Sequence, residues 1–183
     1  MLRSILAGII GRFERTWNYY AGYMRFIANA APVTFLKFSF ITTAADRTAA
    51  PAAALAAAGI VATIAEDCGP CTQISADMAA RSGVQPEVLR AILAGDESAM
   101  GADAALAWRF ARASLARDLE AVEPLREEIV RRWGERGLVS LAFQITGGRM
   151  YPTLKYALGY GKACSKVRVA GEDAPVAHQP LAA

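Results

Sequence analysis

Cysteine and histidine are scarce in this sequence, which has three cysteines and one histidine among 183 residues. A structural zinc site takes four ligands, usually supplied by two pairs of cysteine or histidine. The chain offers one close pair, Cys68 and Cys71, together with a distant Cys164 and His178 near the C-terminus. We therefore expect no metal site.

The sequence also has no strong excess of charge and no long, strongly apolar run. The net charge is +3, and charges of both signs alternate over residues 127–136, so nucleic acid is not an expected partner. No phosphate-loop signature is present, and we expect no cofactor. Residues 49–65 are uncharged but mostly alanine and include Pro51, which is a weak pattern for a membrane span. Arg12 ends the apolar start of the chain too early for a typical signal peptide, so we expect a cytoplasmic protein.

What is abundant is alanine and other hydrophobic residues, which make up 54% of the chain. Apolar residues recur at steps of three and four, which is typical of helices that bury one face. We predict an all-α fold with no strand. The predicted helices cover residues 2–29, 32–41, 51–65, 70–81, 84–93, 103–119, 124–133, 138–146 and 152–164.

The predicted domain organisation is simple. Residues 1–168 form one all-α domain, in which residues 1–48 are an N-terminal helical extension and residues 49–168 are the core that carries the cysteine pair. Residues 169–183 contain two prolines and few large apolar groups, so we expect a disordered tail there.

The cysteine pair lies in Cys68-Gly69-Pro70-Cys71, at the start of a predicted helix. Free backbone N–H groups and the helix dipole stabilise a thiolate at such a position. A disulfide that closes a loop over only two residues removes little entropy from the unfolded chain, so a purely structural role is a poor explanation. The pattern favours a pair that cycles between dithiol and disulfide.

Neighbouring residues extend this candidate site. Ser75 falls on the same helical stripe as both cysteines, where its hydroxyl can bond the Cys71 sulfur or a backbone carbonyl behind it. Glu66 and Asp67 precede the pair. They can favour the helix N-terminus electrostatically, or one of them can accept a proton from a thiol. Both alternatives stay open for each position.

Two resemblances bear on the motif. Cys-Gly-Pro-Cys is identical to the thioredoxin active-site tetrapeptide, but the segment before it is helix-like, whereas that fold places a strand there. The stretch from Ala52 to Gly95, with its motif EDCGPCTQISADMAARSGVQPEVLRAIL, resembles the AhpD-like, carboxymuconolactone decarboxylase superfamily.

This resemblance implies an all-α homo-oligomer that reduces a peroxide or handles a disulfide. It implies that Cys71 is oxidised to a sulfenic acid, that Cys68 resolves it to a disulfide, and that an external dithiol resets the pair. The family motif often has a histidine at the position of Ser75 and a relay glutamate near Ala56, and this chain has neither. Decarboxylation depends on a histidine-containing pocket, and we do not expect it here.

The sequence thus indicates a thiol-dependent peroxidase or a disulfide oxidoreductase, with Cys71 as the more nucleophilic thiol because it lies deeper in the first helical turn. The alternative is a non-enzymatic protein, either a redox sensor or a helical oligomer that binds a ligand. Rapid consumption of peroxide would favour the enzyme, and a change of oligomeric state on slow oxidation would favour the sensor.

Mild oxidation should join Cys68 to Cys71 reversibly and without unfolding, because both thiols share one short turn. Mass spectrometry of peptides from the oxidised protein measures this pairing. A disulfide from either residue to Cys164 as the main product would contradict it.

Overall fold

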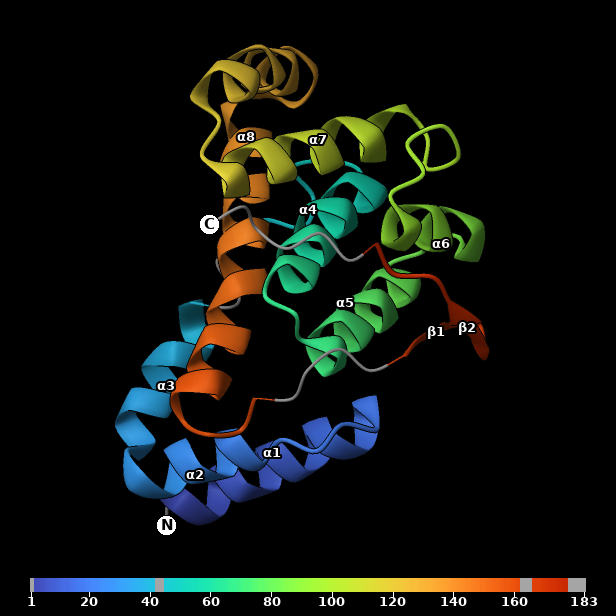
Figure 1. Cartoon of the computed structure of the whole chain (residues 1–183). Coiled ribbons are helices and arrows are strands. Elements are labelled where there is room, and N and C mark those ends of the chain that lie inside the picture. The colour runs from blue at the N-terminus through green and yellow to red at the C-terminus, as the bar shows by residue number, and fades with distance from the viewer. Residues whose placement is uncertain (1, 42–44, 162–165, 178–183) are drawn as a thin grey trace.

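The computed structural model describes residues 2–41, 45–161 and 166–177 (Figure 1). This part of the chain is mainly helical, as predicted, with eight helices and one short hairpin. The helices are α1 (Leu2–Trp17), α2 (Gly22–Ala30), α3 (Pro32–Ile41), α4 (Ala52–Ala65), α5 (Gly69–Arg81), α6 (Pro86–Ala94), α7 (Ala102–Ala116) and α8 (Leu119–Ala157), and the strands are β1 (Val167–Val169) and β2 (Glu172–Ala174). The AhpD-like arrangement and the assembly into a homo-oligomer stay predictions.

Helix α4 lies at the centre of the main core, with α5, α7 and α8 packed around it (Figure 1). Its alanines at 54, 57, 58 and 62 are fully buried, and Ile60 is buried among them. Small side chains let the neighbouring helices approach the α4 backbone closely. Because other helices cover α4 on most sides, it needs no polar face toward solvent. This explains why the alanine-rich segment is apolar all round and still not a membrane span.

Helix α8 differs from the two helices predicted over residues 138–146 and 152–164. It runs without a break through Gly147, Gly148 and Pro152. At Gly134, with φ of +68°, the chain kinks, so α8 consists of two helical segments, and the first ends where the helix predicted over residues 124–133 ends. A Cβ at Gly148 would lie 2.6 Å from the Ala62 Cβ and 2.8 Å from the Gly59 carbonyl oxygen. Gly148 is therefore a packing position against α4, and the break predicted between residues 146 and 152 was wrong.

Helices α1, α2 and α3 bury a small hydrophobic cluster of their own. The single helix predicted over residues 2–29 is wrong, because the chain turns between α1 and α2, where Asn18 has φ of +45°. The guanidinium of Arg81 on α5 stacks 4.0 Å from the Trp17 ring centroid, and Phe38 meets Tyr151 edge to face. These contacts hold the three helices against α5 and α8, while the predicted domain boundaries stay predictions.

The hairpin of β1 and β2 corrects two predictions, that no strand forms and that the tail is disordered from residue 169. Val167 and Val169 are buried against the core, and Arg168 exchanges backbone hydrogen bonds of 2.7 and 3.0 Å with the Gln73 side chain. Further along, the Ala177 N–H donates to the Leu93 carbonyl at 2.8 Å. The end of the predicted tail, residues 178–183 with His178, lies outside the described residues, as does Cys164.

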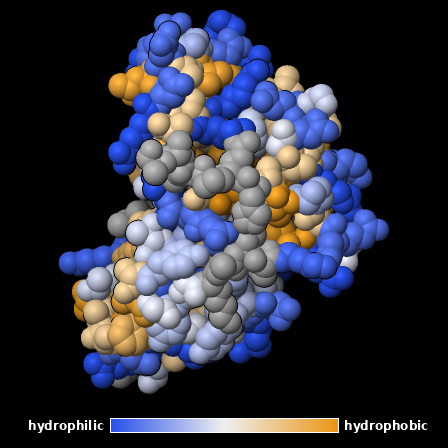
Figure 2. Space-filling model, in the orientation of Figure 1, coloured by the Kyte–Doolittle hydropathy of each residue, from blue (hydrophilic) through white to orange (hydrophobic). Residues whose placement is uncertain are grey.

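The surface is polar over much of the view in Figure 2, and hydrophobic side chains show in several places, one of them the end where α2 and α3 lie. Exposed apolar residues on those two helices are Phe26, Val33 and Phe40. Within the described ranges, no helix combines the length and apolar character needed to cross a bilayer. The predicted cytoplasmic location stays a prediction.

The substitution Gly148→Ala should destabilise the fold by about 1–3 kcal/mol, because its methyl group would push α8 away from α4. Gly147→Ala is the matched control: no atom lies within 4 Å of its added Cβ, so helix propensity should stabilise the protein by about 0.5–1 kcal/mol. Urea unfolding measures both changes. Equal effects of the two substitutions would contradict the close packing.

Candidate functional site

The cysteine pair lies where α4 turns into α5. Asp67 makes the turn with φ of +49°, and Cys68 is the N-cap residue of α5. The Cys68 carbonyl accepts hydrogen bonds from the backbone N–H groups of Cys71 and Thr72 at 3.0 and 2.9 Å, and from the Thr72 hydroxyl at 3.1 Å. Both thiols therefore lie in the first turn of a helix, as the sequence predicted.

A buried lysine from α8 reaches both sulfurs. Lys155 is only 4% exposed, and its Nζ lies 3.4 Å from the Cys68 Sγ and 3.6 Å from the Cys71 Sγ. A buried ammonium is costly unless it is paired with negative charge and hydrogen-bonded. The thiol pair is the anionic partner that this position supplies.

Two tyrosines from the N-terminal part of the chain cover the lysine, Tyr19 in the turn between α1 and α2 and Tyr23 on α2. The Lys155 Nζ lies 5.4 Å from the ring centroid of Tyr19 and 5.9 Å from that of Tyr23, which is within range of a cation–π interaction. Burial raises the pKa of both phenols, so they stay neutral. The segment around α1 and α2 thus completes the site from a distant part of the sequence.

The two thiols share one proton unequally. The hydrogen bond that the Cys71 thiol donates lowers the pKa of Cys68 to about 6, against its burial, and the Lys155 ammonium lowers it further. The same hydrogen bond, together with burial, raises the pKa of Cys71. Burial lowers the pKa of Lys155, but the cysteine pair and the hydrogen bond to Tyr19 outweigh it, so the net shift is upward. The structure therefore pairs a thiolate centred on Cys68 with an ammonium.

The sequence predicts Cys71 as the more nucleophilic thiol because it lies deeper in the first turn, and this stays a prediction. The thiol with the lower pKa is Cys68, the N-cap residue, which accepts the hydrogen bond from the Cys71 thiol. Access gives the opposite order, because Cys71 lines a cavity of about 270 Å³ and Cys68 does not border it. The more acidic thiol is thus Cys68, whereas the sulfur with access to the cavity is that of Cys71.

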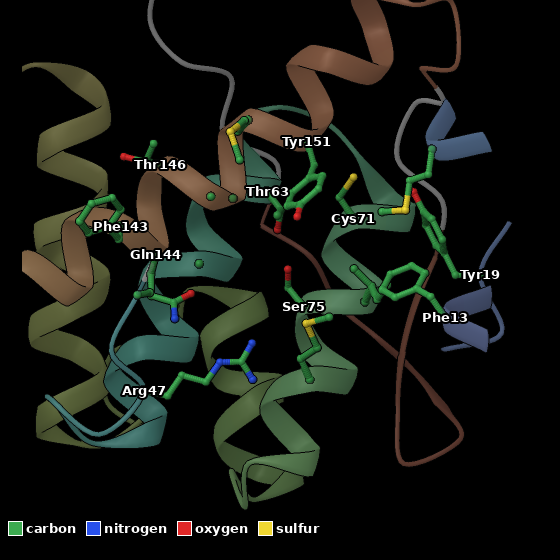
Figure 3. A pocket seen from close by; sticks show the side chains of 18 of the residues that line it. Phe13, Tyr19, Arg47, Thr63, Cys71, Ser75, Phe143, Gln144, Thr146 and Tyr151 are labelled. Carbon is green, nitrogen blue, oxygen red and sulfur yellow. The ribbon is translucent and has the colours of Figure 1, made fainter. Parts of the chain in front are cut away.

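The cavity lies between α5, the middle of α8 and the N-terminal helices (Figure 3). Its walls are aromatic rings and methionines, with a few polar groups among them. They include Phe13, Tyr19, Tyr23, Met24, Met78, Phe143, Met150 and Tyr151, with Arg47, Thr63, Ser75, Gln144 and Thr146. Figure 3 shows the Ser75 hydroxyl directed into this space from α5, the helix that also carries Cys71.

The other predicted site residues are placed differently. Among the described residues, the hydrogen bonds to the sulfurs from other side chains come from Lys155, and none comes from Ser75. The Glu66 carboxylate pairs with the Arg149 guanidinium at 2.6 Å and accepts a hydrogen bond from Thr153 at 3.2 Å. Glu66 therefore ties the α4–α5 turn to α8 and does not contact the thiols.

Sequence reasoning missed Lys155, which is 87 residues from Cys68 and looks like an ordinary polar residue of a helix. It also missed Tyr19, which the predicted helix over residues 2–29 contains. Neither position carries a local signal. In the part of the chain that the structure describes, no three histidine, cysteine, aspartate or glutamate side chains gather as a metal site would need.

Comparisons with protein-family models, curated proteins and solved structures give no match for this chain. The resemblance to the AhpD-like superfamily therefore stays a prediction that depends on the motif alone.

Replacing the buried cation by Lys155→Met should raise the midpoint of thiolate formation by about one pKa unit or more above its value near 6, since a neighbouring positive charge favours the ionised thiol. Thiolate absorbance at 240 nm, followed against pH in the reduced protein, measures the midpoint.

Lys37→Met is the control, because Lys37 is an exposed lysine on α3. This variant should keep the wild-type midpoint. If Lys155→Met folds normally, as judged by circular dichroism, and also keeps that midpoint, the ammonium does not stabilise the thiolate.

Proposed function

We propose that this chain is a thiol peroxidase that reduces a small organic hydroperoxide through the Cys68–Cys71 pair. The observation that carries the proposal is the Lys155 ammonium, buried 3.4 and 3.6 Å from two sulfurs of which one faces a cavity. A reactive cysteine is recognised by its electropositive surroundings and its access to substrate. The pair meets both conditions: the hydrogen bond from the Cys71 thiol and the Lys155 ammonium lower the pKa of Cys68, and the cavity gives a substrate access to Cys71.

A small substrate fits the site better than a protein disulfide. Cys68 is 1% exposed and Cys71 is 5% exposed, so both sulfurs lie too deep for the surface of another protein to reach them. The cavity beside Cys71 is lined largely by aromatic and methionine side chains, which favour an organic molecule over hydrogen peroxide itself.

The negative charge of the pair rests mainly on Cys68, so the reaction begins when the shared proton passes from the Cys71 thiol to Cys68 and leaves a thiolate on Cys71. The Cys71 sulfur attacks the terminal oxygen of the hydroperoxide, the O–O bond breaks, and the sulfur gives up two electrons and becomes a sulfenic acid. Lys155 donates a proton to the departing alkoxide, which leaves as an alcohol. Cys71 is thus the attacking sulfur because it borders the cavity, and the Lys155 ammonium keeps the pair ionised before the substrate binds.

Resolution uses the second thiol. The Cys68 sulfur attacks the Cys71 sulfur, an S–S bond forms, and the sulfenic oxygen leaves as water with the Cys68 proton. An external dithiol small enough to enter the cavity then reduces the disulfide by thiol exchange and is itself oxidised. Each cycle converts one hydroperoxide and one dithiol into an alcohol, water and an oxidised dithiol.

Mixing the reduced protein with cumene hydroperoxide in a stopped-flow instrument should consume one equivalent and form the Cys68–Cys71 disulfide. The rate should rise as the pH passes about 6, where the pair ionises, and then level off. Lys155→Met should slow the reaction at pH 7 by at least about tenfold, since it removes both the charge and the proton donor.

The cysteine variants assign the roles. Cys68→Ser should still react but stop at a sulfenic acid that dimedone traps, whereas Cys71→Ser should react at least about a hundredfold more slowly. Cys164→Ser is the matched control and should react like wild type. A Cys71→Ser variant as fast as wild type would show that Cys68 attacks, and a wild type that consumes no hydroperoxide would end the proposal.

A further inference from the structure

The cavity beside Cys71 carries a charge that the proposed chemistry does not use. Of the described residues that line it, Arg47 is the one with a formal charge, and none is an aspartate or glutamate. Arg47 lies in the segment between α3 and α4, far along the cavity from Cys71 in Figure 3. Its side chain is exposed toward solvent, so it marks the mouth of the cavity.

The neighbouring acid does not neutralise this arginine. The Asp46 carboxylate accepts hydrogen bonds from the Thr48 N–H and hydroxyl at 2.9 and 2.8 Å, and it pairs with Arg136 on α8. No ion pair joins Arg47 to any described acidic residue, whereas most arginines on the core helices have such a partner. The cation at the mouth is therefore available to a ligand.

Polar groups beside Arg47 suit a carboxylate. Gln144 on α8 and Ser75 on α5 line the same part of the cavity, and Figure 3 shows both side chains on the side that Arg47 faces. An amide and a hydroxyl can each donate a hydrogen bond to a carboxylate oxygen that the guanidinium holds. Beyond them the walls are methionines and aromatic rings up to Cys71.

The size of the cavity bounds the ligand. Benzene, with six carbon atoms, occupies an engineered apolar cavity of about 150 Å³. By that ratio, a cavity of about 270 Å³ takes a molecule of roughly ten non-hydrogen atoms. A chain or ring of this size can place an anionic group at Arg47 and its other end near Cys71.

We propose that the cavity binds a medium-sized apolar carboxylate, with the carboxylate at Arg47 and the reactive end at Cys71. The proposal rests on the proposed function for the reaction, and it names the substrate class as hydroperoxides of such acids. The charge of the ligand also sets its orientation in the cavity. The carboxylate stays at the exposed mouth, and the apolar part of the ligand enters the space beside the Cys71 thiol.

Binding of octanoate and octanamide to the reduced protein tests this class without any turnover. The two probes have the same shape and differ in charge. Isothermal titration calorimetry should give octanoate at least about fivefold tighter binding, which is what a partly exposed ion pair supplies. Bound octanoate should also slow alkylation of Cys71 by iodoacetamide, which places it in the cavity.

Arg47→Gln should remove the preference for octanoate and leave octanamide binding unchanged, and Arg47→Lys should keep part of the preference. Lys37→Gln, the matched loss of an exposed cation on α3, should keep all of it. Equal affinity of wild type for the two probes, or an unchanged preference in Arg47→Gln, would overturn the proposal.

The two proposals fail separately. If octanoate binds through Arg47 but the protein consumes no hydroperoxide, the ligand class stands and the peroxidase proposal fails. If cumene hydroperoxide is consumed while octanoate shows no preference over octanamide, the reaction stands and the carboxylate class is wrong.

Discussion

The site depends on one interaction, that of the buried Lys155 ammonium with the Cys68–Cys71 pair. An ammonium at 4% exposure cannot stay charged in an apolar interior without an anionic partner, and a buried thiolate has the same need. The ammonium and the thiolate therefore neutralise each other's charge, with the Lys155 Nζ 3.4 Å from the Cys68 sulfur and 3.6 Å from the Cys71 sulfur. The surrounding helices bring the lysine and the cysteine pair together and shield both from water.

Helix α8 has to pass very close to α4 for Lys155 to reach the first turn of α5. Gly148 provides this approach, because any side chain there would meet Ala62 and the α4 backbone. The pair of Glu66 with Arg149 then fixes the turn before α5 against α8, less than two helical turns from Lys155. Tyr19, from the turn between α1 and α2, covers the ammonium.

The sequence predicted the parts of this arrangement that are local. The start of α5 at the cysteine pair follows from a glycine and a proline suited to a first helical turn, and the burial of α4 follows from its alanines. Lys155 could not be predicted, because its role comes from a contact with Cys68 that spans 87 residues. Gly148 was misjudged for a related reason: helix propensity marks it as a break, whereas tertiary packing makes it necessary.

The most direct test of the central claim is the ionisation of Lys155 itself. With ¹⁵N-labelled lysine, the Nζ resonance of this residue can be titrated in the reduced and the oxidised protein and assigned with Lys155→Met. Oxidation removes the negative charge of the pair and leaves a buried ammonium without its partner, so its pKa should fall well below that of the reduced protein. A pKa that is the same in both redox states would show that the lysine and the cysteine pair are not electrostatically linked, and the account would fail.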